Sequence, residues 1–289
     1  MNPILARTVT GLAAVRATLK SPVVLVPTMG ALHDGHRAPL RRAREIAGPD
    51  GSLVVSVFVN PLQFGAGEDL DRYPRTLADD LALCSQEGVA LVFAPGRDQM
   101  YPVEQMITVS SGSLGQLLEG AFRPGFFDGV LTVVLKLFNL VRPDAAVFGE
   151  KDAQQLALVR RMVADVNLAV EIATAATVRE PDGLAASSRN RYLSAAERGS
   201  ALAIYQALRA GTAAAGEGPR AVLRAARSVL VAAAAATPPL RADYLTLAEP
   251  VTFAEVGPDY TGEALMLVAA TVGTTRLIDN TRLTFGSAP

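Results

Sequence analysis

Both histidines of this 289-residue chain lie three residues apart, in the segment Thr28–His36, which reads Thr-Met-Gly-Ala-Leu-His-Asp-Gly-His. At positions i and i+3 near a helix start, two imidazoles can point to one side. The unpaired N–H groups and positive dipole end of such a helix attract phosphate, and Gly30 and Gly35 leave room for close approach. Imidazole donors suit the charge that develops on a phosphorus atom during substitution. The segment therefore indicates phosphate chemistry.

Other interpretations of the two histidines stay open at this point. Both could be structural, or they could form half of a metal site, for which Cys84 in a predicted helix is the one further soft ligand. A glycine-containing turn after a first strand could bind a dinucleotide, but the G-x-G-x-x-G pattern is absent, and so is a P-loop. The spacing alone does not decide between these roles.

Composition and charge restrict the class of protein. Half of the residues are apolar and 19% are charged, which is enough for a sizeable core. Lys and Arg total 27 against 28 for Asp and Glu, and this balance argues against a nucleic-acid partner. The single cysteine excludes an internal disulfide and fits a reducing compartment, so we expect a cytoplasmic protein. The most apolar run, Val130–Val141, contains Lys136 and is too short to span a membrane, so we expect no membrane partner.

The first part of the chain alternates strand-like and helical patterns, which predicts an α/β fold with a doubly wound, Rossmann-like parallel sheet over residues 1–177. The strand-like runs are nearly all apolar, as expected where helices cover both faces of a sheet. The predicted strands are Val23–Val26, Leu53–Val59, Ala90–Ala94, Ala145–Phe148 and Val170–Ala173. The predicted helices are Pro39–Ala47, Thr76–Glu87, Gly129–Val141 and Gln154–Val166. The histidines follow the first of these strands, at the edge where such sheets bind ligands.

The pattern changes after Val178, and residues 178–289 are predicted to form a smaller C-terminal α+β lid domain. Ser194 and Glu197 form a capping box that opens an Ala-rich helix. A second Ala-rich helix is expected over Pro219–Ala235, followed by strands at Asp243–Leu247, Leu265–Ala270 and Arg276–Asp279. A hinge near Val178 would let this domain close over a reactive intermediate and exclude water.

Five sequence blocks together resemble the signature of the pantothenate synthetase family, within the wider nucleotidyltransferase superfamily. These blocks are Pro27–His36, Phe58–Gly65, Asp69–Arg75, Val147–Asp152 with Gln155, and Ser187–Leu193. The resemblance covers nearly the whole chain. It implies the condensation of pantoate with β-alanine, with ATP consumed, AMP and pyrophosphate released, Mg²⁺ required and a homodimer as the assembly.

The resemblance also implies roles for individual residues. His33 and His36 would contact the nucleotide phosphates, with His36 as proton donor, and Lys151 is a point charge suited to the α-phosphate. The family's nucleotide cradle falls on Met29, Gly30, Ala31, Leu32, His33, Asp34, Gly35, His36, Gly149, Glu150, Lys151, Asp152, Val178, Ala186, Ser187, Ser188 and Arg189. Without the family resemblance, Lys151 would be interpreted as a solvated surface lysine and Ser-Ser-Arg-Asn as an ordinary loop.

Amide side chains are where the family binds its acid substrate. Gln63 and Gln155 would bind pantoate, and Gln63 would also meet β-alanine, since an amide both donates and accepts hydrogen bonds. Gln155 could otherwise be an exposed helix residue. Asn60 fits either a substrate contact or turn chemistry before a proline. Asp79 and Asp80 fit either Mg²⁺ binding or the stabilisation of a helix start, and the metal ligands stay unassigned.

Departures from the family pattern leave other functions open. Phe126 stands where the family usually has His, so any polar contact made there is expected to be lost or passed to water. Asp34 and Arg37 are interpreted as surface substitutions, and Ala186 as a packing change beside the nucleotide. The alternatives to an amide-forming ligase are a nucleotidyltransferase that retains the nucleotide in its product and an inactive ligand-binding relative. The near-neutral charge disfavours a tRNA synthetase.

Overall fold

The computed structural model describes residues 2–286 and divides the chain into two compact units. The first is built from the residues up to Glu150 together with Gln154–Ala176. The second is built from Lys151–Ala153 and the residues from Thr177 on. The assignment of residues 178–289 to a lid that moves over residues 1–177 stays a prediction.

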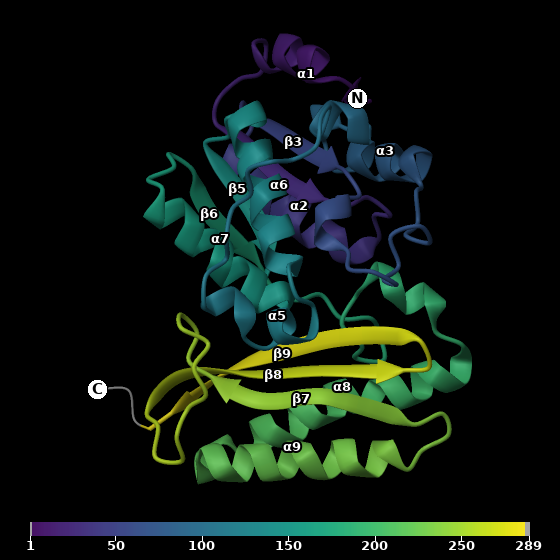
Figure 1. Ribbon diagram of the computed structural model, residues 1–289, viewed down its shortest axis with the longest axis vertical. Helices are drawn as coiled ribbons and strands as arrows, with labels where there is room; N and C mark the ends of the chain where they lie inside the picture. The colour runs from purple at the N-terminus through teal and green to yellow at the C-terminus, as the bar shows by residue number, and fades with distance from the viewer. Residues whose placement is uncertain (1, 287–289) are drawn as a thin grey trace. The chain divides into compact units, whose positions relative to one another are not determined.

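The first unit contains a six-stranded parallel sheet in the order β1-β4-β3-β2-β5-β6. Figure 1 labels β3, β5 and β6 of this sheet. The strands are β1 (Ile4–Ala6), β2 (Val23–Thr28), β3 (Ser52–Val57), β4 (Leu91–Phe93), β5 (Ala145–Gly149) and β6 (Glu171–Ala175). Chain order runs outward from β2 in one direction through β3 and β4, and in the other through β5 and β6. This reversal between β2 and β5 confirms the predicted doubly wound sheet.

Strand side chains alternate between two hydrophobic clusters, one on each face of this sheet. Val23 and Leu25 of β2 belong to one cluster, and Val24 and Val26 belong to the other. The period of two places successive side chains on opposite faces, and both faces are covered by helices. All four side chains are therefore buried, which explains why the strand reads as an uninterrupted apolar run.

Helices pack on both faces of this sheet. Leu12 of α1 (Val9–Arg16), the apolar side of α6 (Phe126–Val141) and that of α7 (Ala153–Asp165) join the first cluster. Leu40 of α2 (Asp34–Ala47) and Cys84 of α3 (Leu77–Gln86) join the second. The shorter helices are α4 (Arg97–Met100) and α5 (Glu119–Phe122), with 3₁₀ turns at η1 (Pro61–Gln63), η2 (Leu114–Gln116) and η3 (Glu150–Asp152).

Two helices begin three or more residues earlier than the sequence pattern predicted. The helix expected from Pro39 begins at Asp34, with Pro39 inside it, because His33 supplies the cap. The helix expected from Gly129 begins at Phe126, after Gly125 with φ +80°. Both corrections concern starts that lack the usual Ser, Thr, Asp or Asn cap.

The second unit is a three-stranded antiparallel sheet with two helices, and it confirms the predicted smaller α+β part. Its strands pair in the order β7-β8-β9. Its main elements are η4 (Ser188–Tyr192), α8 (Ala195–Ala213), η5 (Ala215–Glu217), α9 (Pro219–Ala234), β7 (Leu240–Ala248), β8 (Gly262–Val272) and β9 (Thr275–Phe285). The capping box at Ser194 and Glu197 is present. Leu208 of α8, Leu230 of α9 and Val268 of β8 meet in one core.

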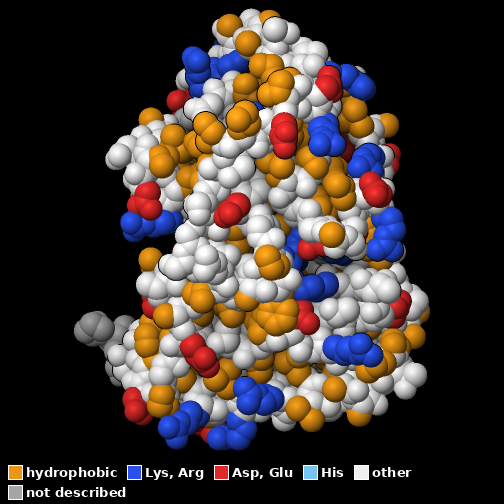
Figure 2. Space-filling view, viewed as in Figure 1, with side chains coloured by type: hydrophobic (Ala, Val, Ile, Leu, Met, Phe, Trp, Pro, Cys, Tyr) orange, Lys and Arg blue, Asp and Glu red, His pale blue; other side chains and the backbone are white. Residues whose placement is uncertain are grey.

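Within residues 2–286, no helix is both long and apolar enough to cross a bilayer. On the face that Figure 2 draws, basic and acidic side chains are interspersed. This distribution agrees with the formal net charge of −1.

Candidate active site

The segment Met29–His36, called here the histidine turn, follows β2 at the point where the strand order reverses. β2 pairs with β3 on one side and with β5 on the other. In open parallel sheets this reversal leaves a crevice at the carboxyl ends of the strands, where ligands bind. The fold therefore places both histidines of the chain at the expected ligand-binding edge.

The backbone of the histidine turn is left-handed at two successive residues. Gly30 has φ +81° and Ala31 has φ +51°. Gly30 also has no room for a side chain, since a Cβ there would lie 2.8 Å from Val57 Cγ1 and 2.9 Å from Asp80 Oδ2. Glycine is thus required at position 30 by both conformation and space.

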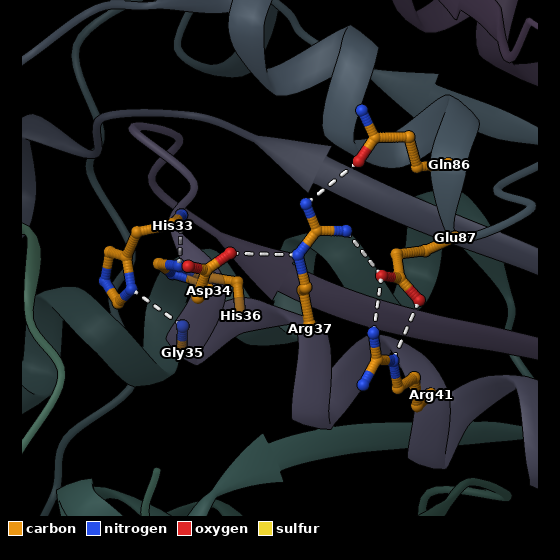
Figure 3. A network of polar contacts seen from close by, with 8 residues as sticks. All are labelled: His33, Asp34, Gly35, His36, Arg37, Arg41, Gln86 and Glu87. Atoms are coloured by element: carbon orange, nitrogen blue, oxygen red, sulfur yellow. Dashed lines mark hydrogen bonds and ion pairs between the residues drawn. The ribbon is translucent and has the colours of Figure 1, made fainter. Parts of the chain in front are cut away.

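The two histidines cap α2 with their own rings (Figure 3). Nδ1 of His33 accepts a hydrogen bond from the Gly35 N–H at 3.1 Å, and Nδ1 of His36 accepts one from the His33 N–H at 3.2 Å. The ring centroids are 4.2 Å apart in an edge-on arrangement. A nitrogen that accepts a hydrogen bond carries no proton, so in each neutral ring the proton lies on Nε2. Each ring therefore has Nε2–H as its donor.

The expectation of unpaired backbone N–H groups at this helix start is wrong for most of the turn. Six amides donate within the chain, those of Gly30, Ala31, Leu32, His33, Gly35 and His36. Their acceptors are side-chain atoms of Thr28, Asp80 and the two histidines, and the carbonyl oxygen of His33. The donors suited to a phosphate here are consequently the imidazole Nε2–H groups, assisted by the helix dipole.

Asp80 contacts the histidine turn from the first turn of α3. Its Oδ1 accepts the Leu32 N–H at 2.7 Å and its Oδ2 accepts the Ala31 N–H at 3.2 Å, and the side chain is buried. Burial raises the pKa of Asp80 above its usual value, and the hydrogen bonds from Leu32, Thr76 and Ala31 oppose that rise. The sequence offered two interpretations of Asp80, Mg²⁺ binding and stabilisation of a helix start, and neither included this contact with the histidine turn.

Asn60 and Gln63 lie together in the turn that contains η1. Asn60 Nδ2 donates to Gln63 Oε1 at 3.1 Å and to the carbonyl oxygen of Gly129 at 3.0 Å. Asn60 Oδ1 accepts from the Tyr101 hydroxyl at 2.8 Å and from the Leu62 N–H at 3.3 Å. These four bonds use the full capacity of the amide. The geometry favours the turn interpretation of Asn60, whose substrate contact stays a prediction.

Gln63 connects this turn to the histidine turn. Gln63 Nε2 lies 3.0 Å from Sδ of Met29, and the side chain is 8% exposed. The backbone of α6 packs directly against this turn, because a Cβ at Gly129 would lie only 2.0 Å from the Leu62 carbonyl oxygen. Met29 and Gln63 are thus brought together in the structure.

Phe126 does not leave the loop without a contact. The guanidinium of Arg123 lies 3.6 Å from the centroid of the Phe126 ring, a cation–π geometry. The same guanidinium donates to the Gln63 carbonyl oxygen at 3.2 Å and pairs with Glu68 at 2.6 Å. An aromatic face thus takes the place of the expected polar contact, by holding an arginine that braces Gln63.

Arg37 is more than a surface substitution (Figure 3). Its guanidinium pairs with Glu87 at 2.6 Å and Asp34 at 3.0 Å, and it donates to Gln86 at 2.9 Å. Arg41 pairs with Glu87 at 3.2 Å. Burial opposes ionisation of Glu87, but the bonds from the two arginines outweigh it and lower the pKa of Glu87 below its usual value. This network fastens the first turns of α2 to the end of α3.

The chain after β5 divides the remaining predicted residues between the two units. Gly149 ends β5 and Gln155 lies half-buried in α7, both in the first unit. Lys151 belongs to the second unit, where its carbonyl oxygen accepts from Asn280 Nδ2 at 2.8 Å. Its Nζ lies 3.8 Å from Asp152 Oδ1. Gln155 is therefore not the exposed helix residue that its sequence position also allowed.

One segment of the second unit, Val178–Asn190, is called here the serine loop. It contains the remaining predicted nucleotide-binding residues, Val178, Ala186, Ser187, Ser188 and Arg189. Ala186 N–H donates to the Val178 carbonyl oxygen at 2.9 Å, and Ser187 Oγ accepts from the Arg189 N–H at 3.2 Å. Arg179 pairs with the buried Asp279 at 2.6 Å. The loop is thus folded back on itself and tied to β9.

Sequence reasoning missed the long-range contacts that hold the predicted site residues in place. They are made by Asp80, Tyr101, Arg123 and the pair of Arg179 with Asp279. Burial raises the pKa of Tyr101, which therefore stays a protonated donor to Asn60. Each of them contacts a residue distant in sequence, so local spacing offers no signal for them.

A parallel sheet in which the helix after β2 begins with two imidazole donors at the strand-order reversal defines an α/β enzyme of the nucleotide-binding class. The family model for pantoate–β-alanine ligase matches residues 5–282. The chain therefore belongs to the pantoate–β-alanine ligase family.

Individual relatives extend over almost the whole chain. The chain is 61% identical to the pantothenate synthetase of Thermobifida fusca, over 98% of this chain and 96% of the relative. It is 57% identical to that of Acidothermus cellulolyticus, over 96% and 91%. The crystal structure of pantothenate synthetase from Thermus thermophilus has a TM-score of 0.89 and 48% identity, over 96% and 98% of the two chains.

A second solved structure carries ligands. The pantoate–β-alanine ligase of Francisella tularensis, complexed with β-γ ATP and β-alanine, has a TM-score of 0.78 and 30% identity. The likeness covers 96% of this chain and 97% of that one.

Proposed function

We propose that this enzyme condenses pantoate with β-alanine in an ATP-dependent reaction that releases AMP and pyrophosphate. The observation that carries the proposal is the match of the family over residues 5–282 around a turn with two oriented imidazole donors. The Francisella tularensis relative, whose complex contains a form of ATP and β-alanine, supports both small-molecule partners.

The first step would form pantoyl-adenylate. A carboxylate oxygen of pantoate attacks the α-phosphorus of ATP, and the bond from that phosphorus to the pyrophosphate oxygen breaks. Negative charge grows on the phosphate oxygens, and the Nε2–H groups of His33 and His36 are the donors suited to it, with Lys151 as a point charge. Gln63 and Gln155 would hold pantoate through its hydroxyl and carboxylate groups.

The second step would form the amide. The amine of β-alanine attacks the carbonyl carbon of the mixed anhydride, the bond from that carbon to the AMP oxygen breaks, and the nitrogen loses a proton. The anhydride must be kept from water during this interval. We propose that residues 178–289 act as the lid, with Ser187, Ser188 and Arg189 on the phosphates and Val178 at the hinge.

Magnesium is proposed to enter with the nucleotide. Within residues 2–286 no group of three or more His, Cys, Asp or Glu side chains could hold a metal ion. Mg²⁺ in such enzymes is usually bound by substrate phosphates with one or two protein carboxylates rather than by a protein cage. The donor set therefore fits a phosphate-borne ion.

A homodimer in the cytoplasm is proposed from the family resemblance and the single cysteine. One exposed apolar segment supports a protein partner, because Val103, Met106 and Ile107 are each more than three-quarters exposed. Sedimentation of the pure protein over a range of concentrations tests the dimer, and a monomer at micromolar concentration contradicts it.

Trapping the intermediate tests the proposed reaction. Enzyme, ATP, Mg²⁺ and pantoate without β-alanine are expected to give pantoyl-adenylate and pyrophosphate, and later addition of β-alanine should give pantothenate and free AMP. An enzyme that keeps the nucleotide in its product shares the first step but releases no AMP. Absence of turnover in folded protein would favour the inactive relative.

A further inference from the structure

One buried side chain beside the histidine turn has no role in the reaction as proposed. Asp80 is 1% exposed. Its two oxygens accept the N–H groups of Leu32 at 2.7 Å and Ala31 at 3.2 Å, and Thr76 Oγ1 donates to Oδ1 at 3.2 Å. The two amides immediately precede His33 in the chain. Asp80 thus holds the backbone from which the first histidine projects.

The conformation that Asp80 holds needs support. Ala31 is fully buried and has φ +51°, a left-handed conformation that costs an L-residue energy and persists only where its surroundings fix it. Asp80 Oδ2 also fills the space beside Gly30, where a Cβ would come within 2.9 Å of it. The carboxylate therefore occupies the inner side of the turn and accepts from the buried amides of Ala31 and Leu32.

We infer that Asp80 is a positioning residue for adenylate formation. By holding the backbone before His33, Asp80 fixes the orientation of the His33 peptide and therefore the hydrogen bonds of both imidazoles. The His33 N–H that donates to His36 Nδ1 belongs to the peptide that joins Leu32 to His33. If that peptide rotates, the bond that keeps the proton of His36 on Nε2 is lost. The inference rests on the proposed function only for its kinetic consequence.

A role as metal ligand is the main competing explanation of this carboxylate. Both oxygens already accept from buried backbone amides, and the side chain lies under the turn rather than at its surface. A metal ligand would need an oxygen directed at the nucleotide. The contacts favour positioning, and the experiment includes an arm that separates the two roles.

Asp80→Asn is the informative variant, because it preserves size and one acceptor. Its Oδ1 can still accept from Leu32, but an amide NH₂ then faces the Ala31 N–H, and two donors cannot bond each other. Glu87→Gln is the matched control. It also removes a carboxylate charge near one end of α3, but the contacts of Glu87 are with Arg37 and Arg41.

Two reporters in the chain separate a displaced turn from a displaced helix. Cys84 lies one turn after Asp80 on α3, is fully buried and is the sole cysteine. Its protection from thiol reagents shows that α3 is still packed. The sole histidines are His33 and His36, so every imidazole ¹⁵N signal of the protein reports on the histidine turn.

Imidazole NMR tests the structural claim directly. In the wild type and in Glu87→Gln, both rings are expected as the Nε2–H tautomer. In Asp80→Asn we expect a mixture of tautomers for His36 while Cys84 stays protected. Wild-type histidine signals in Asp80→Asn overturn the inference, and so does rapid labelling of Cys84, since the residue would then support α3 as a whole.

Kinetics test the consequence for catalysis. Pantoate-dependent exchange of pyrophosphate into ATP is expected to fall about 10²-fold in Asp80→Asn, as for a displacement of about 1 Å, with an unchanged KM for pantoate. Excess Mg²⁺ should not restore the rate, and recovery would instead identify a metal ligand and overturn the inference. If the wild type itself shows no exchange, the proposed function fails, but the NMR comparison still tests Asp80.

Discussion

The histidine turn and the serine loop both carry predicted phosphate-binding residues, but different interactions fix their shapes. The histidine turn is held by a buried carboxylate that accepts two backbone amides and by imidazole caps. The serine loop is held by arginine–carboxylate pairs, in which Arg179 meets Asp279 and Arg198 meets Glu180 and Asp182. The first arrangement depends on backbone amides that donate to one carboxylate and the second on arginine–carboxylate ion pairs, so the two should respond differently to mutation.

The largest expected effect tests whether the region behind the histidine turn is sealed. Burial, assisted by the nearby charge of Asp80, raises the pKa of Cys84 from 9.0 to about 12. Because the thiolate is the reactive form, iodoacetamide should alkylate Cys84 about 10³-fold more slowly in the native state than after unfolding in urea. Mass spectrometry over time measures both rates. Fast labelling of Cys84 in the native state would show that α3 opens readily and that the region behind the histidine turn is not sealed.

The next effect separates catalytic groups from the elements that hold them. His36→Ala and Lys151→Ala are each expected to slow adenylate formation by about 10²- to 10³-fold, the usual loss for one preorganised charge-stabilising group. Pyrophosphate exchange measures the rate, and circular dichroism melting checks that the variants fold. A near-normal rate in either variant refutes the role proposed for that residue.

A smaller effect tests the ion pair of the serine loop. The Asp279 side chain is 2% exposed and receives two hydrogen bonds from Arg179. Asp279→Asn leaves the arginine charge without its partner, and the free energy of unfolding should fall by about 3 kcal/mol. Urea denaturation measures the change.

Glu263→Gln is the matched control, since its pair with Arg282 is about half exposed and should contribute little. If both variants lose the same free energy of unfolding, the buried Arg179–Asp279 pair stabilises the protein no more than the exposed Arg282–Glu263 pair does.

The smallest effect concerns the charged network on the outer side of α2. The pKa of Glu87 is lowered overall, so its contribution to stability is present at neutral pH and is lost as the pH falls through its folded pKa. Glu87→Gln should destabilise the protein by about 1 kcal/mol at pH 7. The difference should begin to shrink as the pH falls to the ordinary glutamate pKa of about 4.3 and should disappear below the lower folded pKa. Urea titrations of both proteins at stepwise lower pH measure it. A constant difference would exclude ionisation as the cause.

Most of the sheet could be predicted because burial on both faces leaves a local signal. Val23–Val26 and Ala145–Phe148 are uninterrupted apolar runs, and both lie in central strands. The strand Ile4–Ala6 and the helix Val9–Arg16 were missed. Three residues are too few to show a period, and the hydrophobic pattern of this short helix is weak.

The site could be predicted only where its chemistry lies within one short segment. The spacing of His33 and His36 is visible in the sequence, but the use of imidazole nitrogens as helix caps is not, so the start of α2 at Asp34 was missed. Asp80 contacts Leu32 across 48 positions of sequence. Such a contact depends on how α3 packs against the sheet, which no single segment encodes.

Gln63 is proposed to bind the acid, so the close approach of α6 to its turn bears on any attempt to change the acid that the enzyme accepts. Because the Leu62 carbonyl oxygen would lie 2.0 Å from a Cβ at position 129, main chain packs directly against main chain there, with no side chain between. Substituting residues can enlarge or reshape a pocket, but it cannot trim a backbone. Redesign for bulkier acids should therefore leave Gly129 in place and seek space at side chains on the opposite side of Gln63.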